Sequence, residues 1–277
     1  MYEGHWKLNG LPFENWGGVE SYFPSPVHES AVLQLKYQIE QRRAIVTLCG
    51  DCGTGKTMII DRLAERLDES AAPLSRVVFP PSDAGQLLGH IADELTGCCG
   101  PADEPQRLTL RRLNDFFEKN IAADRQAVLV IDEAHLLTSG DQLETLRMLI
   151  NLRRTAYRGE SPVTLLLVGQ PTLLTQVERY RALDDRISAK CWLDRFTAEQ
   201  SADYIRHRLR AAGASSAMAT TMFSDDALET LHLRAMGIPR RINRLADLAL
   251  MVGYAEEASR IEAEQIDGIH QELVAAA

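Results

Sequence analysis

Long hydrophobic runs are missing from this sequence of 277 residues. Apolar runs such as residues 128–131 are far shorter than the ~20 residues that a membrane-spanning helix requires. The first seven residues, MYEGHWK, contain neither the basic stretch nor the apolar stretch of a secretory signal. We therefore expect no integral membrane segment and a cytoplasmic location.

Cysteine is scarce and present in an odd number, five in all, with Cys98 and Cys99 adjacent. This usage fits reduced thiols better than a disulfide framework. Cys49 and Cys52 form a C-x-x-C pair, but no second pair follows at the spacing of a zinc site. A structural role for this pair, as a small strand residue and a tolerated loop residue, is therefore favoured over a redox or zinc role.

Positive charge is also in deficit, because the net charge is −9 at pH 7 and the isoelectric point is near 5.3. A surface built entirely for nucleic acid is therefore disfavoured. The basic residues are mostly arginine, which binds phosphate groups through two parallel hydrogen bonds. Binding of DNA stays open as an alternative, because an assembled ring could gather Arg153, Arg154 and Arg158 along one face.

What the sequence does contain is an alternation of strand and helix patterns. At 45% hydrophobic and 25% charged residues, the chain is long enough for a large domain, or for a main domain and a smaller one. Strands are expected at residues 44–49, 76–79, 127–131 and 163–168, and helices at about 56–68, 83–96, 107–122 and 141–157. This order predicts an α/β domain with a mostly parallel sheet.

The strand pattern ends near residue 196. Beyond it, helices are expected at about 197–212, 224–235, 238–255 and 262–275, and the stretch 213–219 is expected to be a surface loop. Residues 1–43 contain aromatic residues and prolines followed by one helix that begins near Ser25 or His28. We therefore expect an α/β nucleotide-binding domain with an N-terminal clasp at residues 1–196 and a small all-helical domain at residues 197–277.

Residues 50–57, GDCGTGKT, match the phosphate-loop pattern G-x-x-x-x-G-K-[ST] between an expected strand and an expected helix. The glycines let the backbone turn its N–H groups toward phosphates, Lys56 reaches the β- and γ-phosphates, and the Thr57 hydroxyl binds Mg²⁺. ATP and Mg²⁺ are therefore the expected cofactors. The predicted nucleotide-binding residues of this loop are Gly50, Asp51, Cys52, Gly53, Thr54, Gly55, Lys56, Thr57 and Met58.

Asp132 and Glu133 directly follow the apolar strand pattern at residues 127–131. A parallel strand there places both carboxylates at the sheet edge where the phosphate loop lies. Asp132 is predicted to hold Mg²⁺ through water, and Glu133 to polarise the water that attacks the γ-phosphate. Paired acids at a strand end also occur as simple helix caps, but the phosphate loop favours the catalytic interpretation. The chain is accordingly predicted to be an ATPase.

Two further polar residues follow strand or helix patterns. Gln170 comes after the strand at residues 163–168, where it could contact the γ-phosphate or the attacking water, and a simple turn residue is the competing interpretation. Arg186 lies between a helix and the expected strand at residues 190–193. An arginine delivered to a neighbouring subunit's nucleotide could occupy this position, although an ordinary surface ion pair is the alternative.

The helical domain supplies another candidate. In residues 237–242, GIPRRI, a proline opens a helix, and Arg240 is predicted to contact the γ-phosphate. Arg241 and Arg244 are the alternatives. His135 is interpreted as a structural turn residue. Tyr22, His28 and Glu29 precede the first expected strand, and these three residues could line the adenine pocket.

With these motifs the sequence resembles an AAA+ ATPase, and more narrowly the general secretion pathway protein A (ExeA-like) family. The resemblance covers nearly the whole chain and rests on residues 8–13 (LNGLPF), 22–26 (YFPSP), 50–57, 131–135 (IDEAH), 168–171 (VGQP), 185–187 (DRI), 204–209 (YIRHRL) and 237–240 (GIPR). The resemblance implies a parallel five-stranded base with a helical lid. It also implies a homo-oligomeric ring, with a hexamer as the family expectation, in which nucleotide is held at a subunit junction. Arg186 would then act in trans and Arg240 would be a second sensor.

Members of that secretion family often continue into a transmembrane helix and a cell-wall-binding domain, and this sequence contains neither. The expectation is then an ATPase that drives or regulates an assembly through an unidentified protein partner, in secretion or cell-envelope assembly. ATPases of DNA transposition of the TniB and TnsC kind share the domain type and the Asp-Glu-Ala-His sequence of residues 132–135. A DNA-bound regulator is therefore the alternative. A nucleotide-dependent scaffold that turns over slowly is the third hypothesis.

Overall fold

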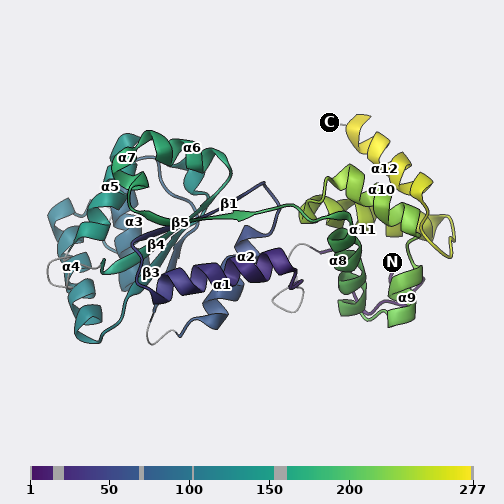
Figure 1. Cartoon of the computed structure of the whole chain (residues 1–277), viewed down its shortest axis with the longest axis horizontal. Coiled ribbons are helices and arrows are strands. Elements are labelled where there is room, and N and C mark those ends of the chain that lie inside the picture. The colour runs from purple at the N-terminus through teal and green to yellow at the C-terminus, as the bar shows by residue number, and fades with distance from the viewer. Residues whose placement is uncertain (1, 15–21, 69–71, 102, 153–160, 276–277) are drawn as a thin grey trace. The chain divides into compact units, whose positions relative to one another are not determined.

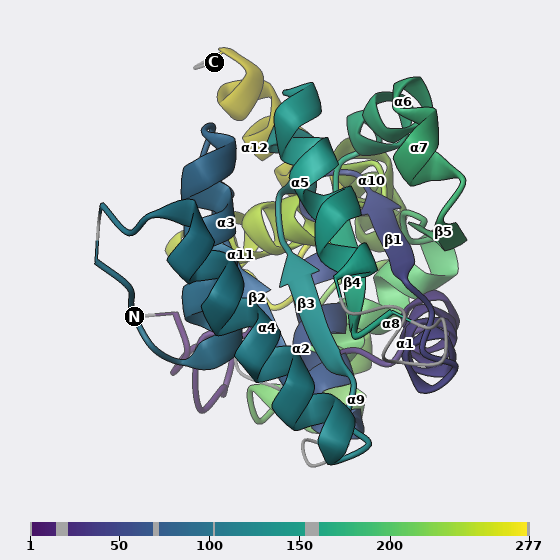
Figure 2. The same cartoon turned by 90° about the vertical axis from the view of Figure 1, so that its left-hand side faces the viewer.

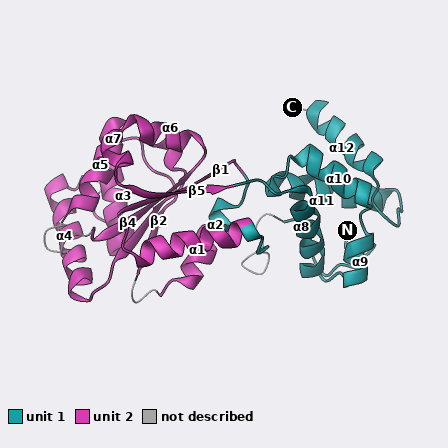
Figure 3. Cartoon of the chain, viewed as in Figure 1, with its two compact units in different colours: residues 1–26, 53–58, 194–277 teal, residues 27–52, 59–193 magenta. Residues whose placement is uncertain are grey.

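The computed structural model describes residues 2–14, 22–68, 72–101, 103–152 and 161–275 (Figure 1). The chain divides into two compact units (Figure 3). Val27–Cys52 and Ile59–Leu193 form the first, which we call the sheet unit. Met1–Pro26, Gly53–Met58 and Asp194–Ala277 form the second, which we call the helical unit.

The sheet unit is built on a parallel sheet of five strands in the order β2-β3-β4-β1-β5. The strands are β1 (Ile45–Gly50), β2 (Leu74–Val77), β3 (Ala127–Ile131), β4 (Val163–Gly169) and β5 (Ile187–Leu193). Every residue of β1, β3 and β4 is buried, as expected for parallel strands that are covered on both faces. The α/β fold predicted from the sequence is therefore confirmed.

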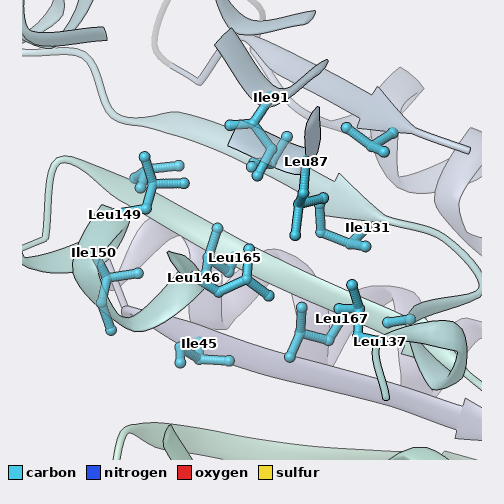
Figure 4. Close-up of a cluster of buried hydrophobic side chains, with 14 of the residues drawn as sticks. Ile45, Leu87, Ile91, Ile131, Leu137, Leu146, Leu149, Ile150, Leu165 and Leu167 are labelled. Atoms are coloured by element: carbon cyan, nitrogen blue, oxygen red, sulfur yellow. The ribbon is translucent and has the colours of Figure 1, made fainter. Parts of the chain in front are cut away.

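Alternate residues of the central strands point to opposite faces of the sheet. On one face, Ile131, Leu165 and Leu167 pack against Leu87 and Leu146 in the largest apolar cluster (Figure 4). On the other face, the neighbouring residues of the same strands join a second cluster, which contains Val46, Leu48, Val128, Val130, Leu166 and Val168. The strands are held between two apolar layers, which fixes which side chains can reach the sheet edges.

Helices cover both faces of the sheet. The second cluster takes its helical residues from α1 (Pro26–Glu40) and α2 (Lys56–Arg66), and the first from α3 (Ala84–Thr96), α4 (Gln106–Ala122), α5 (Gly140–Asn151), α6 (Thr172–Arg179) and α7 (Arg181–Asp184). Helices α3 and α4 lie side by side (Figure 2). The unit is thus a three-layer α/β sandwich whose strand ends are left for loops and short turns.

Four elements differ from the sequence-based expectation. Helix α5 ends at Asn151 instead of residue 157, and strand β5 begins at Ile187 instead of residue 190. The other two are β2 and a short helix. The edge strand β2 covers Leu74–Val77 instead of residues 76–79, and Val78 and Phe79 are exposed after it. The stretch expected as a loop at residues 213–219 contains the short helix α9 (Ser216–Thr221), whose first turn is capped by the Ser215 side chain. Apolar pattern alone does not mark either boundary, since a strand end and a single helical turn carry too few residues to show a period.

The helical unit contains α8 (Ala198–Ala211), α9, α10 (Asp225–Ala235), α11 (Pro239–Ala255) and α12 (Ala263–Ala275) around one apolar core. Helix α8 begins where the sequence predicts it, because Thr197 and Gln200 form a reciprocal capping box. Among the described helices, none is both long and apolar enough to cross a membrane.

The N-terminal segment packs into the helical unit. Trp6 is buried and its indole N–H donates to the Leu250 carbonyl at 3.0 Å, while Tyr2 donates to Asp247. The Arg208 guanidinium donates to the Pro12 and Glu14 carbonyls, each at 2.6 Å. The expected division had placed this clasp with the nucleotide-binding domain, whereas the compact units group residues 1–26 with the helices.

Close packing of Trp6 against α11 gives a prediction for two glycines. A Cβ added at Gly253 of α11 would lie 2.4 Å from Ile261 Cδ1 and 2.8 Å from Trp6 Cζ2, whereas a Cβ at Gly268 of α12 would meet nothing within 4 Å. Gly253→Ala should destabilise the protein by about 1–3 kcal/mol through overpacking. Gly268→Ala, the matched control, should raise stability by about 0.5–1 kcal/mol because alanine favours the helix. Urea unfolding measures both, and equal effects of the two substitutions would contradict the packing described.

Candidate nucleotide site

The ends of three parallel strands place the predicted polar residues at one edge of the sheet. Strand β4 lies between β1 and β3, with Leu48 opposite Val168 and Leu167 opposite Ile131. The phosphate loop begins at the end of β1, Asp132 follows β3, and Gln170 follows β4. Ligands of open α/β sheets bind at this carboxyl edge.

The phosphate loop runs from the end of β1 into the first turn of α2, which begins at Lys56. Gly53 and Gly55 have φ angles of +84° and +101°, which residues other than glycine rarely adopt. The Thr54 side chain is fully buried and Lys56 is 8% exposed. A tight turn that leads into a helix N-terminus directs backbone N–H groups toward an anion, so the local geometry suits a phosphate group.

Within the helical unit, this loop contacts the start of α11. The Arg240 N–H donates to the Gly53 carbonyl at 3.3 Å. A Cβ at Gly53 would lie 2.7 Å from Arg240 Cβ and 3.3 Å from Ile238 Cγ2. Arg240, which the sequence favoured over Arg241 and Arg244, is therefore the arginine that packs on the glycine turn.

Asp132 is almost fully buried at the end of β3, with 5% of its surface exposed. Its Oδ1 accepts from the Glu133 N–H at 2.9 Å, and its Oδ2 accepts from Arg76 Nη2 at 2.5 Å. Arg76 also lies 3.2 Å from Asp61 Oδ1 on α2. Burial raises the pKa of the Asp61 carboxyl, Arg76 opposes that rise, and the negative charges of Asp132 and Glu65 add to it.

Sequence reasoning did not single out Arg76. The available signal is an arginine at the start of the apolar pattern at residues 76–79, in the expected strand that precedes the one ending in two carboxylates. Strand order cannot be read from that pattern, so the pairing of β2 with β3 was needed to bring Arg76 to Asp132.

Glu133 has an unusual backbone for a residue with a side chain. Its φ and ψ angles are +49° and +35°, the left-handed region, directly before the short helix η2 (Ala134–Leu136). Such a conformation is uncommon outside glycine and asparagine and costs about 1–3 kcal/mol. The Glu133 side chain remains 43% exposed. The chain reverses sharply here and leaves this carboxylate accessible beside the buried Asp132.

His135 lies between the side chains of Glu133 and Gln170. Its Nδ1 is 3.2 Å from Glu133 Oε2, and its Nε2 is 3.1 Å from Gln170 Nε2. The His135 backbone carbonyl accepts from Gln176 Nε2 at 2.8 Å. A Cβ at Gly169 would come within 3.1 Å of the His135 backbone nitrogen, so glycine at the end of β4 permits this approach. The expected turn residue thus has side-chain neighbours that its place in the sequence did not indicate.

Other predicted residues lie at separate places. Arg186 follows α7 and donates to Asn151 Oδ1, at the end of α5, at 3.0 Å. The Glu29 carboxylate pairs with Arg66 at 2.7 Å, while Tyr22 and His28 are buried. The arginines at positions 153, 154 and 158, considered for a basic face, lie outside the described residues.

The predicted metal ligands have suitable donor atoms. Mg²⁺ prefers hard oxygen ligands and usually binds through one or two protein oxygens together with substrate phosphates. Thr57 supplies a hydroxyl at the second residue of α2, and Asp132 supplies a carboxylate at the end of β3. The Asp132 oxygens each accept one hydrogen bond already, and a carboxylate oxygen has a second lone pair for another partner. These residues therefore fit Mg²⁺.

Comparison with known proteins gives the family. Residues 39–177 match the AAA domain family. The chain belongs to the AAA family of P-loop proteins. It is 30% identical over 281 residues to general secretion pathway protein A of Aeromonas hydrophila. The aligned region covers 98% of this chain and 50% of that protein. The resemblance predicted from the motifs is confirmed, and the chain spans half the length of this relative.

Solved structures share the AAA fold at low sequence identity. The Aeropyrum pernix ORC2 protein has a TM-score of 0.71 at 16% identity and is matched over 97% of this chain and 72% of its own. Drosophila ORC bound to DNA has a TM-score of 0.69 at 16% identity, over 99% and 66%. A Thermotoga maritima RuvB structure has a TM-score of 0.55 at 19% identity, over 89% and 66%.

Contact between Gly53 and Arg240 gives a prediction. Gly53→Ala places a methyl group against Arg240 Cβ and forces alanine into a φ of +84°. We expect nucleotide affinity to fall about tenfold or more, since the strain costs about 1–3 kcal/mol. Gly89→Ala is the control, because a Cβ there meets nothing within 4 Å. Titration with a fluorescent ATP analogue measures both variants, and unchanged affinity in Gly53→Ala would contradict the close packing at this turn.

Proposed function

We propose that this chain binds and hydrolyses ATP in the presence of Mg²⁺ and uses the nucleotide cycle to drive or regulate the assembly of a partner. The observation that carries the proposal is the placement of three elements at the ends of adjoining parallel strands. These are the phosphate loop after β1, the carboxylate pair after β3 and Gln170 after β4. Membership of the AAA family supports the same conclusion.

Residues of the phosphate loop are proposed to bind the nucleotide, and the carboxylate pair is proposed to hold the metal and activate water. Lys56 neutralises charge on the β- and γ-phosphates, and the N–H groups of residues 50–58 bind the phosphate oxygens. Thr57 would hold Mg²⁺ directly and Asp132 would hold it through water, and the bound ion would neutralise charge that develops on the phosphates. Glu133 orients water and accepts its proton, a role that suits an accessible carboxylate beside a buried one.

Two arginines are proposed to complete the site. Arg240 sits on the glycine turn of the phosphate loop, so occupancy of the loop by nucleotide can act directly on α11. Arg186 is proposed to supply positive charge to the nucleotide of a neighbouring subunit in a homo-oligomeric ring, as arginines in trans do in related phosphoryl-transfer proteins. Gln170 is proposed to contact the γ-phosphate or the water.

Secretion or cell-envelope assembly is the proposed setting. The sequence supports it through the relative named general secretion pathway protein A, which aligns along nearly all of this chain. Because the chain spans half of that relative, the activity of the whole relative is carried over only as part of this proposal. The partner is proposed to be a protein, and a cytoplasmic location is proposed with it.

DNA-dependent regulation is the second candidate. It is supported by the fold shared with Drosophila ORC bound to DNA. It is also supported by the Asp-Glu-Ala-His sequence at residues 132–135, which resembles that of transposition ATPases. A net charge of −9 weighs against it. The two candidates differ in whether DNA increases turnover.

Substitutions in the loop and at the carboxylate separate binding from turnover. Lys56→Ala should abolish ATP binding, because it removes the positive charge that binds the β- and γ-phosphates. Glu133→Gln, nearly isosteric with the wild type, should retain binding and lower kcat by about 10²–10⁴-fold, the usual contribution of a general base. A phosphate-release assay and an ATP-analogue titration measure the two effects. Normal hydrolysis by Glu133→Gln would show that Glu133 does not activate the water.

Assembly and DNA dependence give the next prediction. Turnover should rise more than linearly with protein concentration and should fall about 10³-fold or more in Arg186→Ala, because a neighbour's arginine completes the site. Arg181→Ala, an exposed arginine on α7, is the control and should be active. Turnover per subunit that is independent of concentration would contradict a shared site. Strong stimulation by double-stranded DNA with steep salt dependence would replace the secretion proposal with the DNA-bound one.

A further inference from the structure

His135 touches two side chains that the proposed ATPase would use. Its ring lies between Glu133, 3.2 Å from Nδ1, and Gln170, 3.1 Å from Nε2. The two contacts use opposite ring nitrogens, so the imidazole bridges residues that follow different strands. We propose that His135 is a positioning residue, which holds the Glu133 carboxylate in place and links its orientation to Gln170. The inference rests on the proposed ATP hydrolysis.

Backbone contacts fix the ring where it is. His135 is the middle residue of η2, and its carbonyl accepts from Gln176 Nε2 on α6 at 2.8 Å. Gly169 allows the His135 backbone to approach the end of β4. The imidazole is 15% exposed, compared with 43% for the Glu133 side chain. A nearly enclosed ring on a fixed turn is thus available to restrain a carboxylate that is otherwise free to rotate.

Hydrogen-bond chemistry assigns the tautomer. The Gln170 amide nitrogen is a donor only, so at 3.1 Å from His135 Nε2 it requires a lone pair on that atom. In the neutral ring the proton then resides on Nδ1, which faces Glu133. Among the described residues His135 Nδ1 is buried and makes no hydrogen bond of good geometry, while Glu133 Oε2 is within 3.2 Å. A small rotation of Glu133 completes this bond, and catalytic hydrogen bonds often tighten in this way when substrate binds.

The arrangement couples the end of β4 to the end of β3. If Gln170 turns its amide to present oxygen to His135, Nε2 must carry the proton, and the neutral ring then presents a lone pair to the Glu133 carboxylate. That contact is repulsive, so Glu133 is released. Gln170 follows β4 at the edge where the γ-phosphate is proposed to lie. The orientation of its amide therefore decides whether Glu133 is held.

Variants of His135 separate the two contacts. Asparagine places an amide nitrogen near the Nδ1 position and glutamine places one near the Nε2 position. His135→Ala should lower kcat about 10–100-fold, as loss of an orienting partner does at other sites, with nucleotide affinity and thermal midpoint unchanged. His135→Asn should recover most of the rate, and His135→Gln should remain slow. In the double variant His135→Ala with Gln170→Ala the loss of rate should be smaller than the product of the two single losses, because part of the effect of Gln170 passes through His135.

The opposite kinetic results would overturn the inference. They are a normal kcat in His135→Ala, equal losses of affinity and rate that indicate a structural role, or rate losses of the two single variants that multiply in the double variant. Wild-type turnover and the block in Glu133→Gln are measured beside them. If the wild type turns over and Glu133→Gln is blocked while His135→Ala is normal, only the inference about His135 is contradicted.

A spectroscopic measurement tests His135 without turnover. The ¹⁵N shifts of the ring report which nitrogen carries the proton, and the resonances are assigned by their loss in His135→Asn. The expected result is the Nδ1–H form, with a population that changes in Gln170→Ala. An Nε2–H form, or a spectrum unaffected by Gln170→Ala, would overturn the inference. If the wild type does not hydrolyse ATP, the proposed function fails, and these shifts still decide whether the link exists.

Discussion

Burial of a parallel sheet on both faces is the constraint from which the rest of the sheet unit follows. Strands β1, β3 and β4 are buried along their whole length because helices cover each face, and their only hydroxyl side chains are Thr47 and Thr164, so charged and amide side chains are placed where a strand ends. Parallel pairing makes all of these ends point the same way. Side chains separated by more than a hundred residues along the chain therefore share one edge, and the loop after each strand can carry a different part of the chemistry.

Local backbone geometry then refines what the edge can do. Positive φ angles at Gly53 and Gly55 turn the phosphate loop, and the left-handed backbone of Glu133 separates an accessible carboxylate from the buried Asp132. Two arginines lie beside these segments: Arg76 pairs with Asp132, and Arg240 packs on Gly53. His135 lies between the ends of β3 and β4, with its ring nitrogens 3.2 Å from Glu133 Oε2 and 3.1 Å from Gln170 Nε2.

Much of this organisation could be predicted from the sequence. The periodicity of apolar residues located the strands and the long helices to within a few residues, and the phosphate loop and the Asp132–Glu133 pair were identified by their place after apolar strands. Contacts that depend on strand order or side-chain direction could not be predicted. Arg76 reaches Asp132 because β2 pairs with β3, and His135 meets Gln170 because η2 packs at the end of β4. The N-terminal segment shows the same limit, since no local pattern indicates that Trp6 packs on α11.

The central claim is that the ends of β1, β3 and β4 together form one ATP site. Hydrogen–deuterium exchange of the full chain, with and without a non-hydrolysable ATP analogue and Mg²⁺, tests it most directly. The account predicts slower exchange at residues 50–58, 131–136 and 169–171 together, with the same concentration dependence, and no such change in Lys56→Ala. Protection confined to one of these segments, or appearing elsewhere in the chain without them, would contradict a shared site.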